Sequence, residues 1–112
     1  MQTPLLRPAD LAALSAVLSY WEGHWDWECP TLFGLELPEY RAAVAAWRDT
    51  SDPSVPQVAL ALLGALREFL YGASAVKADL VPGITGLAKA ELVALDHRVG
   101  PYVLSIVNKR TA

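Results

Sequence analysis

Residues 54–71, SVPQVALALLGALREFLY, decide the fold of this chain. Their apolar side chains cover more than one face of a helix, and only Gln57, Arg67 and Glu68 are strongly polar. A helix that is apolar most of the way round is buried in the middle of a bundle. The stretch therefore predicts a central core helix that ends at Gly72.

The start of this core helix has two alternatives. Ser54 followed by Gln57 has the spacing of a capping box, which predicts a start at Ser54. Asp52 as the cap, with Pro53 in the first helical position, fits equally well. Both starts lie within residues 49–54, DTSDPS, whose turn-forming residues mark a clear boundary.

Two further helices are predicted on the N-terminal side of this boundary. The first begins near Pro8, whose fixed φ suits a first helical turn, continues through Trp21 and stops at Gly23. The second covers about residues 38–48. Apolar residues at steps of three and four give each helix one buried stripe. The stripes are Leu11, Leu14, Leu18 and Trp21 in the first helix, and Tyr40, Val44 and Trp47 in the second.

The C-terminal part has a less regular pattern. Within residues 73–86, a short helix over residues 75–81 is an open alternative, which the Pro82-Gly83 pair would end. A helix is expected over about residues 87–98, and Gly100-Pro101 then kinks the chain or ends that helix. A last helical stripe reaches about Asn108. The apolar residues of these two parts are Leu87, Leu92, Leu95 and Val99, followed by Tyr102, Val103, Ile106 and Val107.

Together these elements predict an all-α fold. We expect one compact domain over residues 1–112, a bundle of four to five helices with a long Trp-rich connection between the first two. A length of 112 residues is typical of one domain, and 54% hydrophobic with 19% charged residues is enough for a real core. No internal repeat and no pair of strand-like segments competes with this interpretation.

The composition also bears on the compartment. Cys29 is the only cysteine, which excludes an intramolecular disulfide and fits a reducing environment. The N-terminus has no basic region before its apolar residues, so no signal peptide is expected. The longest weakly charged run, residues 53–66, is shorter than the roughly 20 residues of a membrane span. We therefore expect a cytoplasmic protein with no membrane contact.

Residues 20–39, YWEGHWDWECPTLFGLELPE, contain the candidate functional residues. Three of the four tryptophans and five of the twelve acids lie there, with no Lys or Arg to pair with them locally. Tryptophan offers a large, rigid contact area, and acidic groups attract a basic partner. Trp21 and Trp47 are expected in the core, whereas Trp25 and Trp27 could lie in the core or at an interface. The predicted partner-binding residues are Glu22, Trp25, Asp26, Trp27, Glu28 and Glu36.

Other kinds of site fit the sequence less well. A metal site would use His24, Asp26 and Glu28, which share one side of an extended segment but match no strong metal-binding spacing. Cys29 with a histidine would need a lowered thiol pKa, and the neighbouring acids raise it. Paired carboxylates for hydrolysis lack a cleft, and nucleic-acid binding lacks a basic stripe. We expect no enzyme activity, no cofactor, no metal and no nucleic-acid partner. The residues considered for these sites were His24, Asp26, Glu28, Cys29, Glu36 and His97.

The run WEGHWDWECPTLFGLELPEYRAAVAAW, residues 21–47, resembles small acidic immunity proteins of bacterial interbacterial toxin systems. The resemblance implies a short cytoplasmic inhibitor that binds one cognate toxin and blocks its active site or a surface the toxin needs. It assigns no role to any single residue. The expected function is therefore a protein-binding inhibitor of the immunity or antitoxin type. The alternatives are a helical homodimerisation or scaffold module and, third, a small metal-dependent enzyme.

Overall fold

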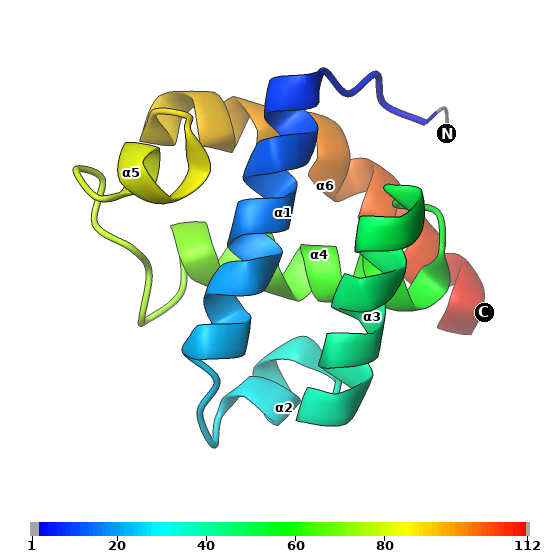
Figure 1. Ribbon diagram of the computed structural model, residues 1–112. Helices are drawn as coiled ribbons and strands as arrows, with labels where there is room; N and C mark the ends of the chain where they lie inside the picture. The colour runs from blue at the N-terminus through cyan, green and yellow to red at the C-terminus, as the bar shows by residue number, and fades with distance from the viewer. Residues whose placement is uncertain (1–2, 112) are drawn as a thin grey trace.

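The computed structural model describes residues 3–111, and its central element is α4, the helix predicted as the core (Figure 1). Six helices are present over the described residues: α1 (Pro8–Gly23), α2 (Cys29–Phe33), α3 (Leu37–Thr50), α4 (Pro56–Leu70), α5 (Val81–Thr85) and α6 (Lys89–Thr111). In Figure 1, α4 crosses the middle of the molecule, with α1 and α3 on one side and α6 on the other. The expected all-helical bundle is confirmed, although its six helices exceed the four to five predicted.

The burial of α4 confirms the prediction of a central core helix. Leu62 and Leu66 are fully or almost fully buried, and each side chain of this size gains about 1.5–3 kcal/mol on leaving water. Ala59, Ala61 and Ala65 of α4 are also buried. Their small side chains let α1, α2, α3 and α6 pack close to α4. The core of the protein therefore surrounds α4 on several sides.

Both predicted starts of this helix were too early, because α4 begins at Pro56. The hydroxyl and the backbone N–H of Ser54 both donate to the carboxylate of Asp52, at 2.6 and 2.9 Å. Ser54 is thereby held in a turn and does not cap the helix. Val55 is the residue before the first helical turn, and Pro56 occupies the first position, where its missing N–H would have no intrahelical partner.

The buried stripes of α1 and α3 are confirmed. Trp21, Tyr40 and Trp47 are buried, and each polar group on these rings has a partner. The Trp21 indole N–H donates to the carbonyl of Ala65 at 3.1 Å, and the Tyr40 hydroxyl donates to the carbonyl of Leu18 at 2.6 Å. Burial raises the pKa of Tyr40, so its hydroxyl stays protonated. Leu11, Leu14, Leu18 and Val44 complete the stripes, and only Leu11 is partly exposed.

The long connection between α1 and α3 contains an unpredicted short helix, α2. Its five residues include Pro30 in the first turn, and Gly34 ends it with φ 70°, a conformation that favours glycine. Phe33 is buried against Gly64 of α4. Five residues are too few for a helical period to be visible in the sequence, which explains why the connection was predicted without a helix.

The C-terminal part lacks two of the alternatives that the sequence left open, a helix over residues 75–81 and a helix end at Gly100-Pro101. Residues 75–80 are not helical, and the helix begins at Val81 with Pro82 in its first turn, where proline is tolerated. Likewise, α6 runs without interruption through Gly100 and Pro101. Pro101 is exposed and has no backbone N–H, so the carbonyl of His97 loses its helical hydrogen-bond donor. His97 is also exposed, so water can replace that donor. Residues on the other face keep α6 against the core on both sides of the proline, namely Leu92, Leu95, Val99 and Val103.

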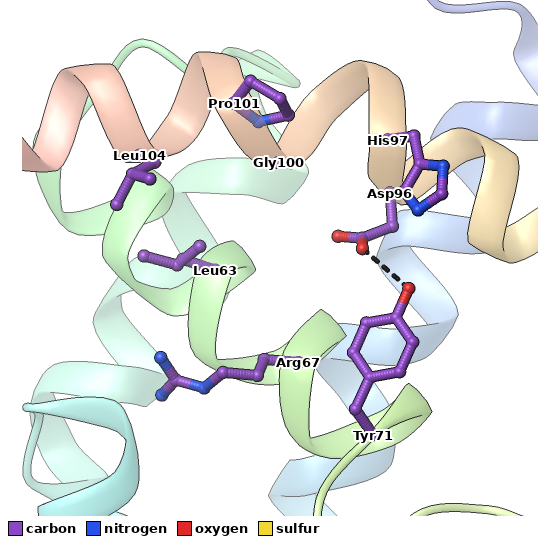
Figure 2. Close-up of a pocket in the computed structure, with 8 residues that line it drawn as sticks. All are labelled: Leu63, Arg67, Tyr71, Asp96, His97, Gly100, Pro101 and Leu104. Carbon is purple, nitrogen blue, oxygen red and sulfur yellow. Dashed lines mark hydrogen bonds between the residues drawn. The ribbon is translucent and has the colours of Figure 1, made fainter.

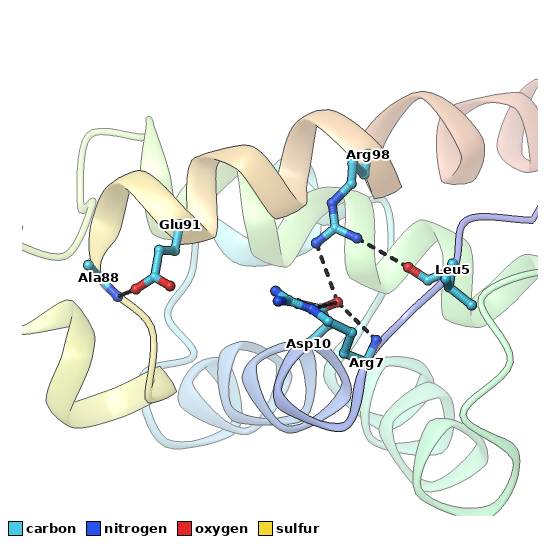
Figure 3. A network of polar contacts seen from close by, with 6 residues as sticks. All are labelled: Leu5, Arg7, Asp10, Ala88, Glu91 and Arg98. Carbon is cyan, nitrogen blue, oxygen red and sulfur yellow. Dashed lines mark hydrogen bonds and ion pairs between the residues drawn. The ribbon is translucent and has the colours of Figure 1, made fainter.

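A buried carboxylate joins the start of α1 to the middle of α6 (Figure 3). The side chain of Asp10 has no exposed surface, and it pairs with Arg7 at 3.2 Å and with Arg98 at 3.3 Å. Arg98 also donates to the carbonyl of Leu5 at 3.1 Å. The hydrogen bond from the Arg7 side chain is the main reason why the pKa of Asp10 falls to about 2, with Arg98 contributing in the same direction. None of the helices over residues 3–111 has the length and apolarity needed to cross a membrane.

Candidate functional site

A tight turn before α2 holds the exposed tryptophan of the Trp-rich connection. One carboxylate oxygen of Asp26 accepts a hydrogen bond from the backbone N–H of Glu28 at 2.9 Å. The backbone N–H of Cys29 donates to the Asp26 carbonyl at 3.2 Å, and the Asp26 N–H points to the Cys29 sulfur at 3.4 Å. Residue 27 at the top of this turn therefore faces away from the bundle. We call residues 26–28 the Trp27 turn.

The two tryptophans whose position the sequence left open have different surroundings. Trp27 is 86% exposed. Trp25 is partly buried, with its ring 5.2 Å from Phe33 and 4.9 Å from Tyr40 between centroids. Trp25 therefore covers the core and supports the turn from below, whereas Trp27 offers its indole ring to solvent. Trp21 and Trp47 are buried, as predicted.

The acids predicted as partner-binding do not all carry a free charge. Glu22 pairs with Arg48 of α3 at 3.0 Å, so the prediction that these acids lack basic partners was wrong for this residue. The missing signal was tertiary, because Arg48 lies outside residues 20–39. Asp26 and Glu28 are exposed on the Trp27 turn, and neither pairs with a basic group of residues 3–109. Glu36 is exposed just before α3, where the helix dipole favours its charge.

The residues considered for a metal or a nucleophile have other partners. The His24 ring stacks on Tyr20 with centroids 3.9 Å apart, and its Nδ1 lies 2.7 Å from the Tyr20 carbonyl oxygen. Over residues 3–111, no three His, Cys, Asp or Glu side chains are grouped so that they could hold a metal ion. Cys29 is buried, and burial is the main cause that raises its thiol pKa, with Asp26 and Glu68 adding to it. The predicted direction of this shift is confirmed, but burial contributes more than the neighbouring acids.

A shallow groove between α4 and α6, shown in Figure 2, was not predicted from the sequence. Its volume is about 570 Å³. One wall is formed by Leu63 and Arg67 of α4 and by Tyr71, the residue that follows the helix, at steps of four residues. A row of this spacing was visible in the sequence, but its counterpart required α6 to continue through Pro101. The other wall contains Asp96, His97, Gly100, Pro101 and Leu104. We call this feature the α4–α6 groove.

Comparison of the chain with protein-family models, with curated proteins and with solved structures found no match. No residue role is therefore taken from a relative. The Trp27 turn and the α4–α6 groove are two surface features with a defined geometry.

Proposed function

We propose that this protein binds another protein through the Trp27 turn and acts as an inhibitor of the immunity or antitoxin type. The observation that carries the proposal is the 86% exposure of Trp27 on a turn that Asp26 fixes. Tryptophan is the residue most enriched among interface hot spots, and a turn ordered before binding loses little entropy when the partner arrives. Exposure of the apolar indole ring to water is unfavourable, and insertion of the ring into a pocket of the partner removes this exposure.

Charge defines the kind of partner that fits this turn. Asp26 and Glu28 lie on either side of Trp27 and have no basic partner among residues 3–109. A partner with Lys or Arg groups around an apolar pocket is complementary to this arrangement. The acids mainly raise the rate of association, and the buried indole mainly lengthens the complex's lifetime. Glu36 adds negative charge nearby, whereas Glu22 contributes less because Arg48 already neutralises it.

Inhibition follows if the partner's pocket is its active site or a surface it needs. The resemblance of residues 21–47 to immunity proteins supports this step, because those proteins block toxins by direct binding. The parts of the turn then have separate roles. Trp27 fills the pocket, Glu28 pairs with a basic group, and Trp25 holds the turn in place from the core side.

Affinity capture from a lysate of the source organism tests this proposal. The parent chain is compared with Trp27→Ala and with Leu5→Ala, a matched control that also removes a large exposed apolar side chain. The proposal expects one stoichiometric basic protein with the parent and with Leu5→Ala, and its loss with Trp27→Ala. Asp26→Ala is unsuitable because Asp26 builds the turn, so Glu28→Gln is the charge variant. Equal capture by Trp27→Ala, with all variants folded by circular dichroism, would place binding on another surface.

The captured protein then provides the functional test. Its activity is measured with increasing amounts of the parent, and the proposal expects full inhibition near one equivalent. Removal of Trp27 should raise the concentration for half inhibition at least about 30-fold, the effect of losing about 2 kcal/mol at a hot spot. Binding without any inhibition would support a binding module but contradict the inhibitor role.

A homodimer is the second candidate, and the exposure of Tyr71 and Leu104 at 54% and 45% favours it. Both side chains line the α4–α6 groove, so a second copy could cover them. Sedimentation equilibrium of the parent over a 100-fold range of concentration separates the candidates. A mass that rises to twice that of the chain supports the homodimer.

A further inference from the structure

The two walls of the α4–α6 groove have the spacing that lets a third helix pack between them. Leu63, Arg67 and Tyr71 form one wall. The opposite wall is formed by residues 96, 100 and 104 of α6, which repeat the spacing of four. Side chains four residues apart lie on one face of a helix, and eight residues extend for about 12 Å, or two turns. Rows of this spacing are the ridges between which a packed helix lies.

One end of the groove is lined by apolar side chains, and the wall is low in the middle. Gly100 has no side chain and lies between the longer residues of its wall. Leu63 and Leu104 lie at the same end of the groove, and Pro101 adds an apolar ring beside them (Figure 2). Leu104 is 45% exposed, so covering it would remove apolar surface from water. A helix with a stripe of apolar residues matches this end.

The other end of the groove carries an uncompensated negative charge. The carboxylate of Asp96 accepts a hydrogen bond from the Tyr71 hydroxyl at 3.1 Å and pairs with no basic group of residues 3–109. Pro101 has no N–H to offer the His97 carbonyl, which leaves a second acceptor on this side of α6. Arg67, in contrast, already pairs with Glu68 at 3.2 Å and donates to the Leu32 carbonyl. A cationic group of a partner would therefore pair with Asp96 at this end of the groove.

We propose that the α4–α6 groove binds an amphipathic helix of a protein partner, about two turns long, with a Lys or Arg beside its apolar stripe. The apolar stripe covers Leu63 and Leu104, and the basic group pairs with Asp96 over the Tyr71 ring. A shallow groove encloses a small ligand poorly, whereas a helix can cover its whole length. This site goes beyond the proposed function, because it is separate from the Trp27 turn and does not depend on it.

A displayed library of random 16-residue peptides, selected on the immobilised full chain, tests the site without knowledge of the partner. Selected peptides are synthesised with a fluorophore, and their Kd is measured by anisotropy. The variants are Leu104→Glu and Asp96→Asn, with Leu80→Glu as a matched control at another exposed leucine. Trp27→Ala is included to separate this groove from the Trp27 turn. Circular dichroism and thermal unfolding confirm that each variant is folded.

The expected peptides share apolar residues at steps of three and four and carry Lys or Arg, and they become helical when bound. Their Kd should rise at least about tenfold with Leu104→Glu and about fivefold with Asp96→Asn, and should not change with Leu80→Glu or Trp27→Ala. The site is overturned if no peptide is enriched, if the enriched peptides lack this pattern, or if Leu104→Glu has no effect. Peptides lost only with Trp27→Ala would support the Trp27 turn and overturn the groove. A dimer of the parent that Leu104→Glu dissociates would show that a second copy covers the groove, and would also overturn this assignment.

Discussion

Arg98 in α6 lies 3.3 Å from the carboxylate of Asp10 at the start of α1, and that carboxylate has no exposed surface. This ion pair joins segments that are far apart in the sequence. Arg7, the residue just before α1, holds the same carboxylate, so two cations share one buried anion. Such an arrangement is stable only while Asp10 is ionised.

The pairing predicts a loss of stability in acid. The pKa of Asp10 is lowered from 3.8 to about 2, so its ionised form stabilises the fold above about pH 4 and this contribution disappears as the pH falls towards 2. Because both arginines are substantially exposed to water and salt, we expect roughly 1–2 kcal/mol from this group. Urea unfolding between pH 2 and 7 should show that Asp10→Asn is less stable at pH 7 and less sensitive to acid. Asp79→Asn, at an exposed position that has no ion pair with residues 3–109, should keep the parent's pH dependence.

Replacement of Pro101 is expected to increase the stability of the fold. It lies inside α6, where it removes one helical hydrogen bond and crowds the His97 carbonyl. Pro101→Ala should therefore raise the free energy of unfolding by about 1–3 kcal/mol, measured by urea unfolding at pH 7. The matched control is Pro82→Ala in the first turn of α5, where proline costs little, and it should change stability by less than about 0.5 kcal/mol. An unchanged or lower stability for Pro101→Ala would mean that the proline fixes a bend that the core requires.

The contrast between Pro101 and Leu62 shows what the sequence could predict. Around Leu62, the apolar residues are dense enough to predict a buried helix without knowledge of its neighbours. At Pro101, the local rule predicts a kink or an end, and the helix does not end there, because Val99 and Val103 are buried on the opposite face. Local preference decided the structure only where tertiary packing agreed with it. Ser54 does not begin α4 for a local reason, because its hydroxyl and backbone N–H are bonded to Asp52 two residues earlier.

The candidate site was predictable in composition but not in geometry. The sequence showed that residues 20–39 combine tryptophans with acids, and Trp27 and Glu28 are indeed exposed there. It could not show that Trp25 turns inward onto Phe33, because that contact depends on the unpredicted helix α2. It also could not show that Glu22 meets Arg48, which requires α1 and α3 to pack side by side.

The contact between Gly64 of α4 and Phe33 of α2 requires the two helices to lie close together. A Cβ at this position would lie 3.0 Å from the ring of Phe33 and 3.3 Å from its Cα. Alanine would gain about 1 kcal/mol in helix propensity but push Phe33 and α2 outward, at a cost of about 1–3 kcal/mol. Gly64→Ala should therefore lower the free energy of unfolding by about 1 kcal/mol, measured by urea unfolding. Gly83→Ala, where a Cβ meets nothing within 4 Å, should show no such loss.

Cys29 should be slow to react in the folded protein. Its thiol is buried and its pKa is raised from 9.0, so at pH 8 it has less thiolate than a free cysteine. An aromatic disulfide reagent at pH 8 should label the native chain at least about 100-fold more slowly than the urea-unfolded chain. Labelling at the rate of the unfolded chain would show that α2 opens readily. The native rate should increase as the pH is raised from 7 to 9.

The emission of the four tryptophans reports directly on the Trp27 turn. Trp21 and Trp47 are buried and Trp25 is partly buried, so Trp27 is the one ring that water surrounds. The parent's fluorescence should contain a red-shifted component that acrylamide quenches readily. Trp27→Phe should remove this component and leave a blue-shifted, weakly quenched spectrum, with thermal unfolding unchanged because the ring makes little contact with the core. Trp47→Phe is the reverse control, since it should keep the quenchable component and destabilise the fold through the lost bond to Ser15, at 2.8 Å in the parent. If Trp27→Phe instead left the quenching unchanged and lowered stability, its indole would be packed in solution. It would then not be available to a partner.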